Sequence, residues 1–130
     1  MIDKNLTYAV VGASNDENKY GHKVFLDLLQ NGFHVIAINP NEKEILGEKV
    51  YATLTDFGKE IDVVIFVVPP KVTEMVLEEV LQLKIFQVRM QPGSESEDAI
   101  SFCKENNITC THDACIMIQR QTEEKNNTSQ

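Results

Sequence analysis

The sequence predicts an α/β fold, in which helices cover both faces of a parallel sheet of five strands. Two observations predict this class. Apolar runs without polar alternation recur along the chain, as in strands that are buried on both faces. Stretches in which apolar residues follow helical spacing lie between these runs. Such an alternation of strands and helices indicates parallel strands joined by right-handed crossovers.

Five short apolar runs, rich in β-branched residues, are the expected strands. The first four end close to a glycine or a proline, residues that commonly end strands. The fifth run is the weakest. The expected strands cover residues 7–11, 35–38, 62–68, 86–90 and 108–111.

Each of the first two expected helices is marked by an apolar stripe and by one terminal residue. Gly32 stands where a helix C-cap favours positive φ, and Pro70 suits a first helical position because its missing N–H is not needed there. The first stripe consists of Val24, Phe25, Leu28 and Leu29. The second consists of Val72, Met75, Val76, Val80 and Leu83, with Glu74, Glu78 and Glu79 expected largely on its solvent side.

A third helix is predicted after residue 94. Ser94 and Glu97 have the spacing of a capping box, in which each side chain bonds a free backbone N–H of the first turn. The inner face of this helix would consist of Ala99, Phe102 and Cys103.

Residues 41–59 fit neither a helix nor a strand, because Gly47 and Gly58 interrupt them. We expect an irregular crossover there, with at most one helical turn at residues 55–57. The expected domain then covers residues 1–121. Residues 122–130 form a polar tail without an apolar anchor, which we expect to be mobile unless another segment docks it.

Composition narrows the classes of function. The chain has 130 residues, 12 Lys and Arg against 20 Asp and Glu, and a net charge of −8, which argues against a nucleic-acid binder. Its three cysteines suit a reduced protein rather than a disulfide scaffold. The longest apolar run, Val63 to Pro70, is too short to cross a bilayer. No basic-then-apolar leader opens the chain, so we expect a cytoplasmic protein.

Ligands of open parallel sheets bind beyond the carboxyl ends of the strands, which directs attention to the loops that follow the expected strands. The first loop contains Gly12, Ala13, Ser14 and, later, Gly21. It is similar to a dinucleotide-binding turn, where a helix N-terminus receives phosphate, although Ser14 replaces the second glycine. We expect this loop to wrap a pyrophosphate and include Lys19 and Tyr20 among its contacts.

The end of the second expected strand argues against NAD. An NAD site has a carboxylate there for the ribose hydroxyls, whereas this chain has Asn39, Pro40 and Asn41, with Lys43 nearby. The Asn39 amide and the Lys43 ammonium would favour an adenosine that carries an extra phosphate. Both coenzyme A and NADP fit that description.

The order of these motifs resembles the family of small single-domain CoA-binding proteins, which are similar to the N-terminal domain of the succinyl-CoA synthetase α subunit. The resemblance runs from about Tyr8 to Ile118. It is carried by the Val10–Ser14 loop with Gly21, the Val35–Asn41 and Ile45–Tyr51 stretches, Asp62–Val64 leading to Val68–Pro70, Gln91–Gly93, and Asp113 with Cys115.

This resemblance implies a Rossmann-like three-layer sandwich with strand order 3-2-1-4-5 and coenzyme A across its carboxyl edge. Gly12, Ala13 and Ser14 would then meet the pyrophosphate, and Asn39, Pro40 and Lys43 would flank the 3′-phosphate. The adenine side would be lined by Val68, Pro69 and Pro70, and Gln91 would reach the pantetheine arm. Two departures from the family pattern are Asn106–Asn107 before the last strand and the acidic Asp16–Glu17 in the phosphate loop.

We therefore expect a binding module for CoA or an acyl-CoA that acts as a non-catalytic sensor, a carrier or the partner of an enzyme, with a protein partner or a homodimer as further possibilities. Two alternatives stay open. One is an NADP-linked or other nucleotide-dependent enzyme that uses Cys115, His112 or His22, and the other is an interaction module with a vestigial pocket. We expect no metal at residues 110–115, because alternate residues of an extended segment point to opposite faces.

Overall fold

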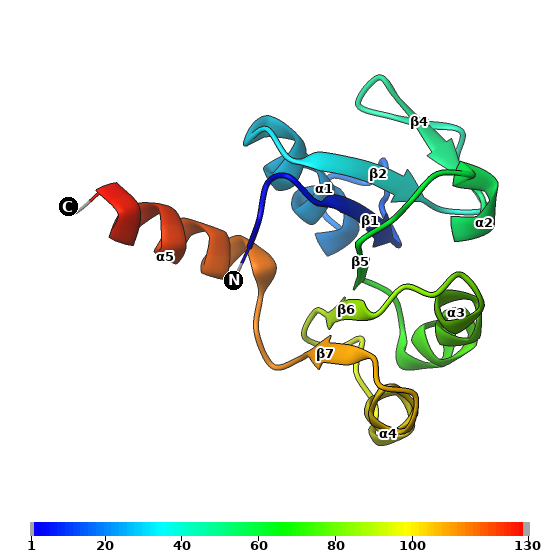
Figure 1. Cartoon of the computed structure of the whole chain (residues 1–130). Helices are drawn as coiled ribbons and strands as arrows, with labels where there is room; N and C mark the ends of the chain where they lie inside the picture. The colour runs from blue at the N-terminus through cyan, green and yellow to red at the C-terminus, as the bar shows by residue number, and fades with distance from the viewer. Residues whose placement is uncertain (1, 129–130) are drawn as a thin grey trace.

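The computed structural model describes residues 2–128 and contains one mostly parallel sheet with helices on both faces (Figure 1). The first half of the chain forms β1 (Thr7–Val11), α1 (Tyr20–Gln30), β2 (His34–Ile38), β3 (Glu44–Ile45), β4 (Glu48–Tyr51) and α2 (Leu54–Phe57). The second half forms β5 (Val63–Phe66), α3 (Pro70–Gln82), β6 (Gln87–Met90), α4 (Glu97–Glu105), β7 (Thr109–Thr111) and α5 (Ile116–Thr128).

The α/β Rossmann-like class is confirmed, but the predicted count of five strands is wrong. The sheet has seven strands in the order β3-β4-β2-β1-β5-β6-β7, and only the β3–β4 pair is antiparallel. The run at residues 62–68 becomes β5 and pairs directly with β1. The predicted order 3-2-1-4-5 agrees with the structure only if the parallel strands are numbered along the chain with β4 as the third. With that numbering, β7 is a sixth parallel strand beyond β6.

The additional strands lie in the segment that was expected to be irregular. Residues 41–59 contain β3, β4 and the single turn of α2. In β4, Glu48 and Lys49 are exposed, whereas Val50 is buried and pairs with Ala37 of β2. A short strand with two charged residues, next to the edge strand of the sheet, shows no continuous apolar run, which is why the sequence pattern did not reveal it.

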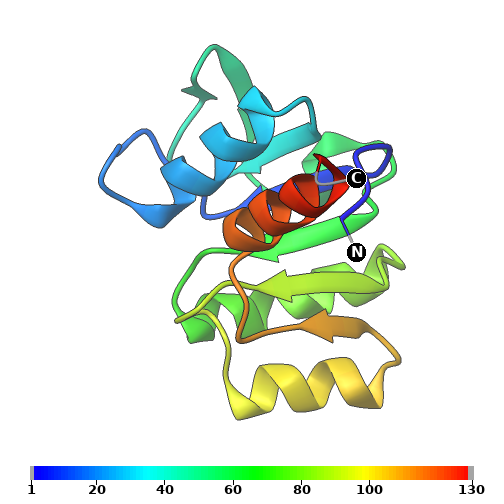
Figure 2. The ribbon, with the colours of Figure 1, turned by 90° about the vertical axis from the view of Figure 1, so that its left-hand side faces the viewer.

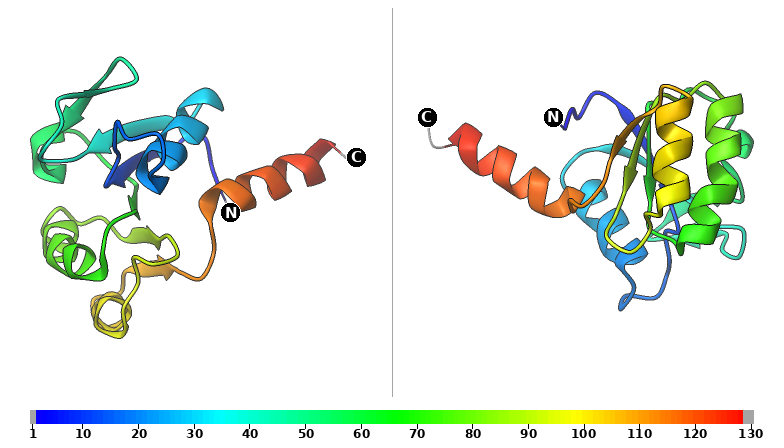
Figure 3. Two further views of the ribbon diagram at one scale, coloured as in Figure 1. Left: turned by 180° about the vertical axis from the view of Figure 1, so that it is seen from behind. Right: turned by 90° about the horizontal axis from the view of Figure 1, so that it is seen from below.

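Two hydrophobic layers separate the sheet from its helices. On one face, Ala9 and Val11 of β1 pack with Leu54 of α2, Leu77 of α3 and Ala99 of α4. On the other face, Tyr8 and Val10 pack with Phe25 of α1 and Ile116 of α5. Figure 3 shows α3 and α4 on one side of the sheet and α5 on the other. Successive residues of β1 thus serve both layers, as its continuous apolar run predicts.

The second apolar stripe is partly misassigned. The buried residues of α3 are Thr73, Leu77 and Val80, and Met75 is 69% exposed. Two of the glutamates that were expected on the solvent side make hydrogen bonds within the domain. The Glu74 carboxylate accepts from Ser96 Oγ at 2.7 Å, and the Glu79 carboxylate accepts from the Thr55 hydroxyl at 2.6 Å.

The capping box is also placed differently from the prediction. The N-cap of α4 is Ser96, whose hydroxyl accepts a hydrogen bond from Ala99 N at 3.0 Å. Ser94 is only 3% exposed, and its hydroxyl accepts from Val68 N at 3.0 Å. Ser94 therefore joins the loop after β6 to the loop after β5, while Ala99 and Cys103 are buried on the inner face of α4 as expected.

Helix α5 leads away from the sheet on the side of α1 (Figures 1 and 3). Arg120 of α5 makes a two-pronged ion pair with Asp27 of α1, with N–O distances of 2.7 and 2.8 Å. Beyond residue 121 the chain continues as helix, and Glu123 accepts a hydrogen bond from Ile2 N at 3.1 Å. The domain boundary at residue 121 stays a prediction, and residues 129–130 of the expected tail lie outside the described residues.

Candidate functional site

An open cleft of about 1020 Å³ runs along the carboxyl edge of the sheet. Figure 2 shows β5, β6 and β7 pointing to one edge, where the loop before α1 also lies. The walls come from the loops after β1, β2, β4, β5 and β6 and from the first turns of α3. This position beyond the strand ends is where open parallel sheets hold their ligands.

Two glycines shape the first wall of the cleft. A Cβ atom on Gly12, whose φ is +102°, would lie 2.3 Å from the carbonyl oxygen of Val67. A Cβ atom on Gly21 would lie 1.9 Å from the carbonyl oxygen of Gly12. Helix α1 therefore begins in direct backbone contact with the end of β1. Although eight residues separate the two glycines in sequence, Gly21 performs the close helix–strand packing of a third fingerprint glycine.

Two helices begin at the cleft without a side-chain cap. Lys19 is the N-cap of α1 and Pro69 is the N-cap of α3, and neither makes a side-chain capping bond. Lys19, Tyr20, Pro69 and Pro70 all line the cleft. Because unbonded N–H groups and the helix dipole favour negative charge at a helix N-terminus, both ends are suited to anionic groups of a ligand.

The Asn39 side chain holds two of the cleft loops together. Its Nδ2 donates to the Ala13 carbonyl at 2.8 Å, and its Oδ1 accepts from Asn41 N at 2.8 Å. Ser14 lies next to this junction, is largely buried, and accepts from Asp16 N through its hydroxyl at 3.0 Å. The Asn39 side chain thus uses its oxygen and one of its two N–H groups within the chain, and the Ser14 hydroxyl oxygen serves there as an acceptor.

The structure brings ten of the thirteen predicted contact residues into the lining of the cleft. They are Gly12, Ser14, Lys19, Tyr20, Gly21, Asn39, Pro40, Val68, Pro69 and Pro70. Their roles as ligand contacts stay predictions. The lining also contains residues that the prediction did not include, namely Val11, Asn18, Ile38, Asn41, Ala52, Thr53, Val67, Val72, Met75, Val76, Glu79, Pro92, Gly93 and Ser94.

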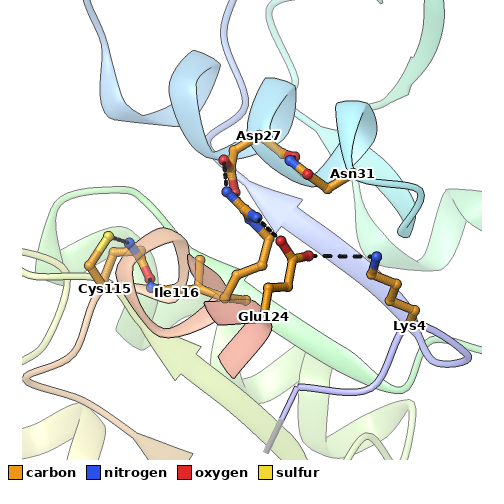
Figure 4. Close-up of polar contacts among 8 residues, drawn as sticks. Lys4, Asp27, Asn31, Cys115, Ile116 and Glu124 are labelled. Carbon is orange, nitrogen blue, oxygen red and sulfur yellow. Dashed lines mark hydrogen bonds and ion pairs between the residues drawn. The ribbon is translucent and has the colours of Figure 1, made fainter. Parts of the chain in front are cut away.

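Three predicted contact residues lie outside the lining. Ala13, in the loop after β1, is fully buried, and Lys43 is exposed in the turn before β3. Gln91 is 2% exposed and bonds the chain itself: its Oε1 accepts from Ile116 N at 3.0 Å and its Nε2 donates to Cys115 Sγ at 3.3 Å. Gln91 therefore anchors the start of α5 (Figure 4 shows Cys115 and Ile116), which the sequence did not indicate.

Some of the lining residues that were not predicted from the sequence form an apolar flank along α3. Val72, Met75 and Val76 line the cleft, and so do Ala52 and Thr53, which follow β4. Met75 was expected in the core, and its high exposure is the result of its place on this flank. The position of residues 52 and 53 could not be predicted once β4 had been missed.

The titratable groups of the cleft are few. Among the described residues that line it, Lys19, Tyr20 and Glu79 carry ionisable side chains. Lys23 lies beside them, with its ammonium 5.7 Å from the centre of the Tyr20 ring. Positive charge at the cleft therefore comes from the helix N-termini and from Lys19 with the neighbouring Lys23, whereas the exposed Lys43 is outside the lining.

Cys115, His112 and His22, the candidate catalytic residues of the alternative enzyme hypothesis, are outside the cleft lining. His22 is buried, with Nδ1 2.9 Å from the Ser14 carbonyl oxygen. His112 Nδ1 lies 2.6 Å from Asp113 Oδ2, and within residues 2–128 no hydrogen bond joins His112 to Cys115. Over the same residues, no cluster of three or more His, Cys, Asp or Glu side chains has the geometry to hold a metal ion.

None of the helices in the described part of the chain combines the length and the apolar character needed to cross a bilayer. A second, smaller cavity of about 620 Å³ lies by the amino ends of the strands, between the segments that precede β5 and β6.

Comparison with known proteins connects the cleft to one family. The family model of a CoA-binding domain matches residues 6–121. The alpha subunit of acetate–CoA ligase (ADP-forming) II from Pyrococcus furiosus is 40% identical over 72 residues, which are 55% of this chain and 16% of that subunit. The uncharacterized protein YneT of Bacillus subtilis is 28% identical over 118 residues, which are 91% of this chain and 87% of YneT.

Solved structures agree with this family. A conserved hypothetical protein from Pyrococcus furiosus has a TM-score of 0.84 at 38% identity, over 88% of this chain and 98% of that one. The dinucleotide-forming acetyl-coenzyme A synthetase 1 of Candidatus Korarchaeum cryptofilum has a TM-score of 0.71 at 26% identity, over 80% of this chain and 25% of that one. The resemblance inferred from the sequence motifs is confirmed, and the chain belongs to the CoA-binding domain family.

Proposed function

We propose that this chain binds coenzyme A or an acyl-CoA along the cleft and acts as a non-catalytic sensor, carrier or partner module. The observation that carries the proposal is the junction of Gly12, Gly21 and the uncapped start of α1, in a chain of the CoA-binding domain family. The pyrophosphate would lie at this junction, within reach of the Ser14 hydroxyl and Lys19. The anionic ligand is then held by local groups, so the net charge of −8 does not oppose it.

The shape of the cleft supports a long ligand. Its volume of about 1020 Å³ is slightly larger than the range of about 300–1,000 Å³ for small-molecule sites. The adenine would pack against Pro40 and Val68–Pro70, and the apolar flank of Val72, Met75 and Val76 offers a surface for the less polar parts of the ligand. Binding rather than chemistry is supported by the lining, because it does not include the candidate catalytic residues Cys115, His112 and His22.

The ligase and synthetase relatives contain this region as a small part of a longer chain. We therefore propose that this chain also has a protein partner, which supplies or receives the acyl group. A homodimer is the other form of assembly compatible with the proposal.

The test is a titration of the purified protein with CoA, with NADP run in parallel. A ligand at a hundredfold excess over its Kd stabilises the folded state by about 2.7 kcal/mol. We expect CoA to raise the melting temperature and NADP to have little effect. The chain has no Trp and three Tyr, so CoA that copurifies would also raise the ratio of absorbance at 260 nm to that at 280 nm. No stabilisation by CoA would overturn the proposal.

A charge reversal tests the placement of the pyrophosphate. Lys19→Glu should weaken CoA binding at least tenfold, whereas Lys59→Glu, the same change at an exposed position beside the second cavity, should leave it unchanged. Equal effects of the two variants would refute the placement. Asn39→Asp is a less suitable probe, because a carboxylate there would face the Ala13 carbonyl oxygen and disturb the loop itself.

A further inference from the structure

The two arginines of the chain have different surroundings. Arg120 is paired with the carboxylates of Asp27 and Glu124. Arg89 of β6 is only 8% exposed, and within residues 2–128 its side chain forms no ion pair. Proteins rarely enclose an arginine without a charged partner, because an unpaired buried charge costs free energy. The placement of Arg89 therefore points to a partner from outside the chain.

The contacts of Arg89 leave most of its donors unused. Its Nη1 donates to Gln119 Oε1 of α5 at 2.8 Å, and this is the only side-chain hydrogen bond that Arg89 makes in the described part of the chain. The other nitrogens are not sealed from solvent, because Thr73 Oγ1 is the one enclosed side-chain nitrogen or oxygen without a partner among the same residues. A guanidinium presents several N–H donors in a planar fork, so an acceptor from solvent can still bind it.

The carboxylate of Glu123 acts on Arg89 only through its charge. Glu123 Oε1 accepts from Ile2 N at 3.1 Å, and its Oε2 accepts from Gln119 Nε2 at 2.8 Å. Burial lowers the pKa of Arg89, and the interactions with Tyr8 and Glu123 act in the opposite direction. Arginine keeps its proton in proteins, so a cation without a bonded counter-ion lies between α5 and the sheet.

The sheet face on which Arg89 lies is open to solvent. Val88 and Met90 of β6 belong to the buried layer under α3 and α4, so Arg89 between them faces the other way. On that face it pairs with the fully buried Ile65 of β5 on one side and with the half-buried Thr111 of β7, the edge strand, on the other. Figure 2 shows α5 beside α1 on this side, and none of the described helices lies over β6 and β7 there. Arg89 thus stands where an apolar face becomes a solvated one.

We infer that Arg89, held in place by Gln119, is the centre of a binding site for a small monocarboxylate, between α5 and the open face of β6 and β7. The guanidinium fork matches the two oxygens of a carboxylate. A single cation beside the negative charge of Glu123 suits a monoanion better than a dianionic phosphate. Because little of Arg89 is exposed, a small molecule reaches it more readily than a side chain of a folded partner does. The inference is independent of the ligand in the cleft, since neither Arg89 nor Gln119 lines that cleft.

The test compares sodium acetate with sodium chloride at equal ionic strength, each added to the whole purified chain. In a proton–nitrogen NMR spectrum, the two arginines give two Nε–H signals, and Arg120, whose Nε donates to Asp27 at 2.7 Å, is the internal reference. We expect acetate to shift the Arg89 signal until the shift saturates, while the Arg120 signal stays in place and chloride has no such effect. Equal shifts of both signals, or the same shift with both salts, would overturn the inference.

Two variants that add the same charge test the position of the site. Thr111 pairs with Arg89 across β6 and β7, so Thr111→Glu supplies a carboxylate from within the chain. This variant should weaken acetate binding by about tenfold or more. Gln121→Glu, at an exposed position of α5, should leave acetate binding unchanged. Equal acetate affinities of the two variants would refute the placement at Arg89, and thermal melts verify that both are folded.

A third variant separates a ligand site from a purely structural role of Arg89. The wild-type chain should melt at a higher temperature in acetate than in chloride, and Arg89→Met should lose this difference. In chloride, Arg89→Met should be at least as stable as the wild type, because an unpaired buried charge has been removed. A lower melting temperature of Arg89→Met, together with no effect of acetate on the wild type, would overturn the inference. Sedimentation that shows self-association, abolished by Arg89→Met, would overturn it as well, because the carboxylate would then come from a second copy of the chain.

Discussion

The Glu42 carboxylate accepts two hydrogen bonds from Asn15, one from the main-chain nitrogen at 2.8 Å and one from Nδ2 at 3.1 Å. Asn15 Nδ2 also donates to the Glu44 carbonyl at 2.8 Å. These bonds attach the loop between β1 and α1 to the turn between β2 and β3. An acid that stands close to a proposed phosphate site is thus used to hold the phosphate loop in place.

Removal of this attachment should weaken ligand binding more than folding. In Glu42→Ala, the loop loses two bonds to a charged acceptor, and we expect CoA affinity to fall about tenfold, or about 1.4 kcal/mol. Because these bonds are exposed to solvent, the free energy of unfolding should fall by about 1 kcal/mol or less. Isothermal titration and denaturant unfolding measure the two effects. Glu48→Ala, at an exposed position of β4, is the control, and unchanged affinity in Glu42→Ala would contradict the role of Glu42.

A methyl group at Gly21 should be strongly destabilising. Alanine normally favours a helix over glycine by about 1 kcal/mol, but a Cβ atom here would lie 1.9 Å from the Gly12 carbonyl oxygen. We expect Gly21→Ala to lower the free energy of unfolding by about 3 kcal/mol. Gly32→Ala is the comparison, because its Cβ would meet no atom within 4 Å at a φ of +80°, and its cost should be about 1–2 kcal/mol. Equal stability losses would show that the contact with Gly12 is not decisive.

The ion pair between α1 and α5 should contribute measurably to stability. The side chains of Arg120 and Asp27 are 9% and 16% exposed, so Arg120→Ala would leave the Asp27 carboxylate partly buried and unpaired (Figure 4 shows Asp27, Glu124 and Lys4). We expect a loss of roughly 2–3 kcal/mol in denaturant unfolding. Lys4→Ala removes an exposed pair, in which Lys4 and Glu124 are 3.6 Å apart, and should change stability by about 0.5 kcal/mol or less. If both variants unfold alike, α5 is not held by Arg120.

The parts of the fold that the sequence predicts are those set by local patterns. The continuous runs that became β1 and β5 and the proline at the start of α3 need no information from distant residues. β4 depends on its pairing with β2, which a short segment with two charged residues does not reveal. The same limit explains the cap of α4. The Ser94 hydroxyl accepts a hydrogen bond from Val68 N, a distant residue, and Ser96 is the residue that caps the helix.

The candidate site shows the same difference between features set by local patterns and features set by contacts with distant residues. The loops after β1, β2 and β5 meet as predicted, because parallel strands bring their carboxyl ends to one edge. Gln91 has the expected position in the chain, but its amide is bonded to Cys115 and Ile116, residues far away in sequence. Met75 was assigned to the core by its spacing, and only the rotation of α3 about its axis, with Thr73 and Leu77 inward, places it on the cleft.

The bond from Asn39 to Ala13 and the backbone contact between Gly21 and Gly12 have a thermodynamic consequence. Both are made within the chain, so the first wall of the cleft has its conformation without help from a ligand. Ordering a flexible loop on association consumes part of the interaction free energy. A preorganised wall avoids that entropic loss, and most of the energy of its contacts with a ligand should therefore appear as affinity.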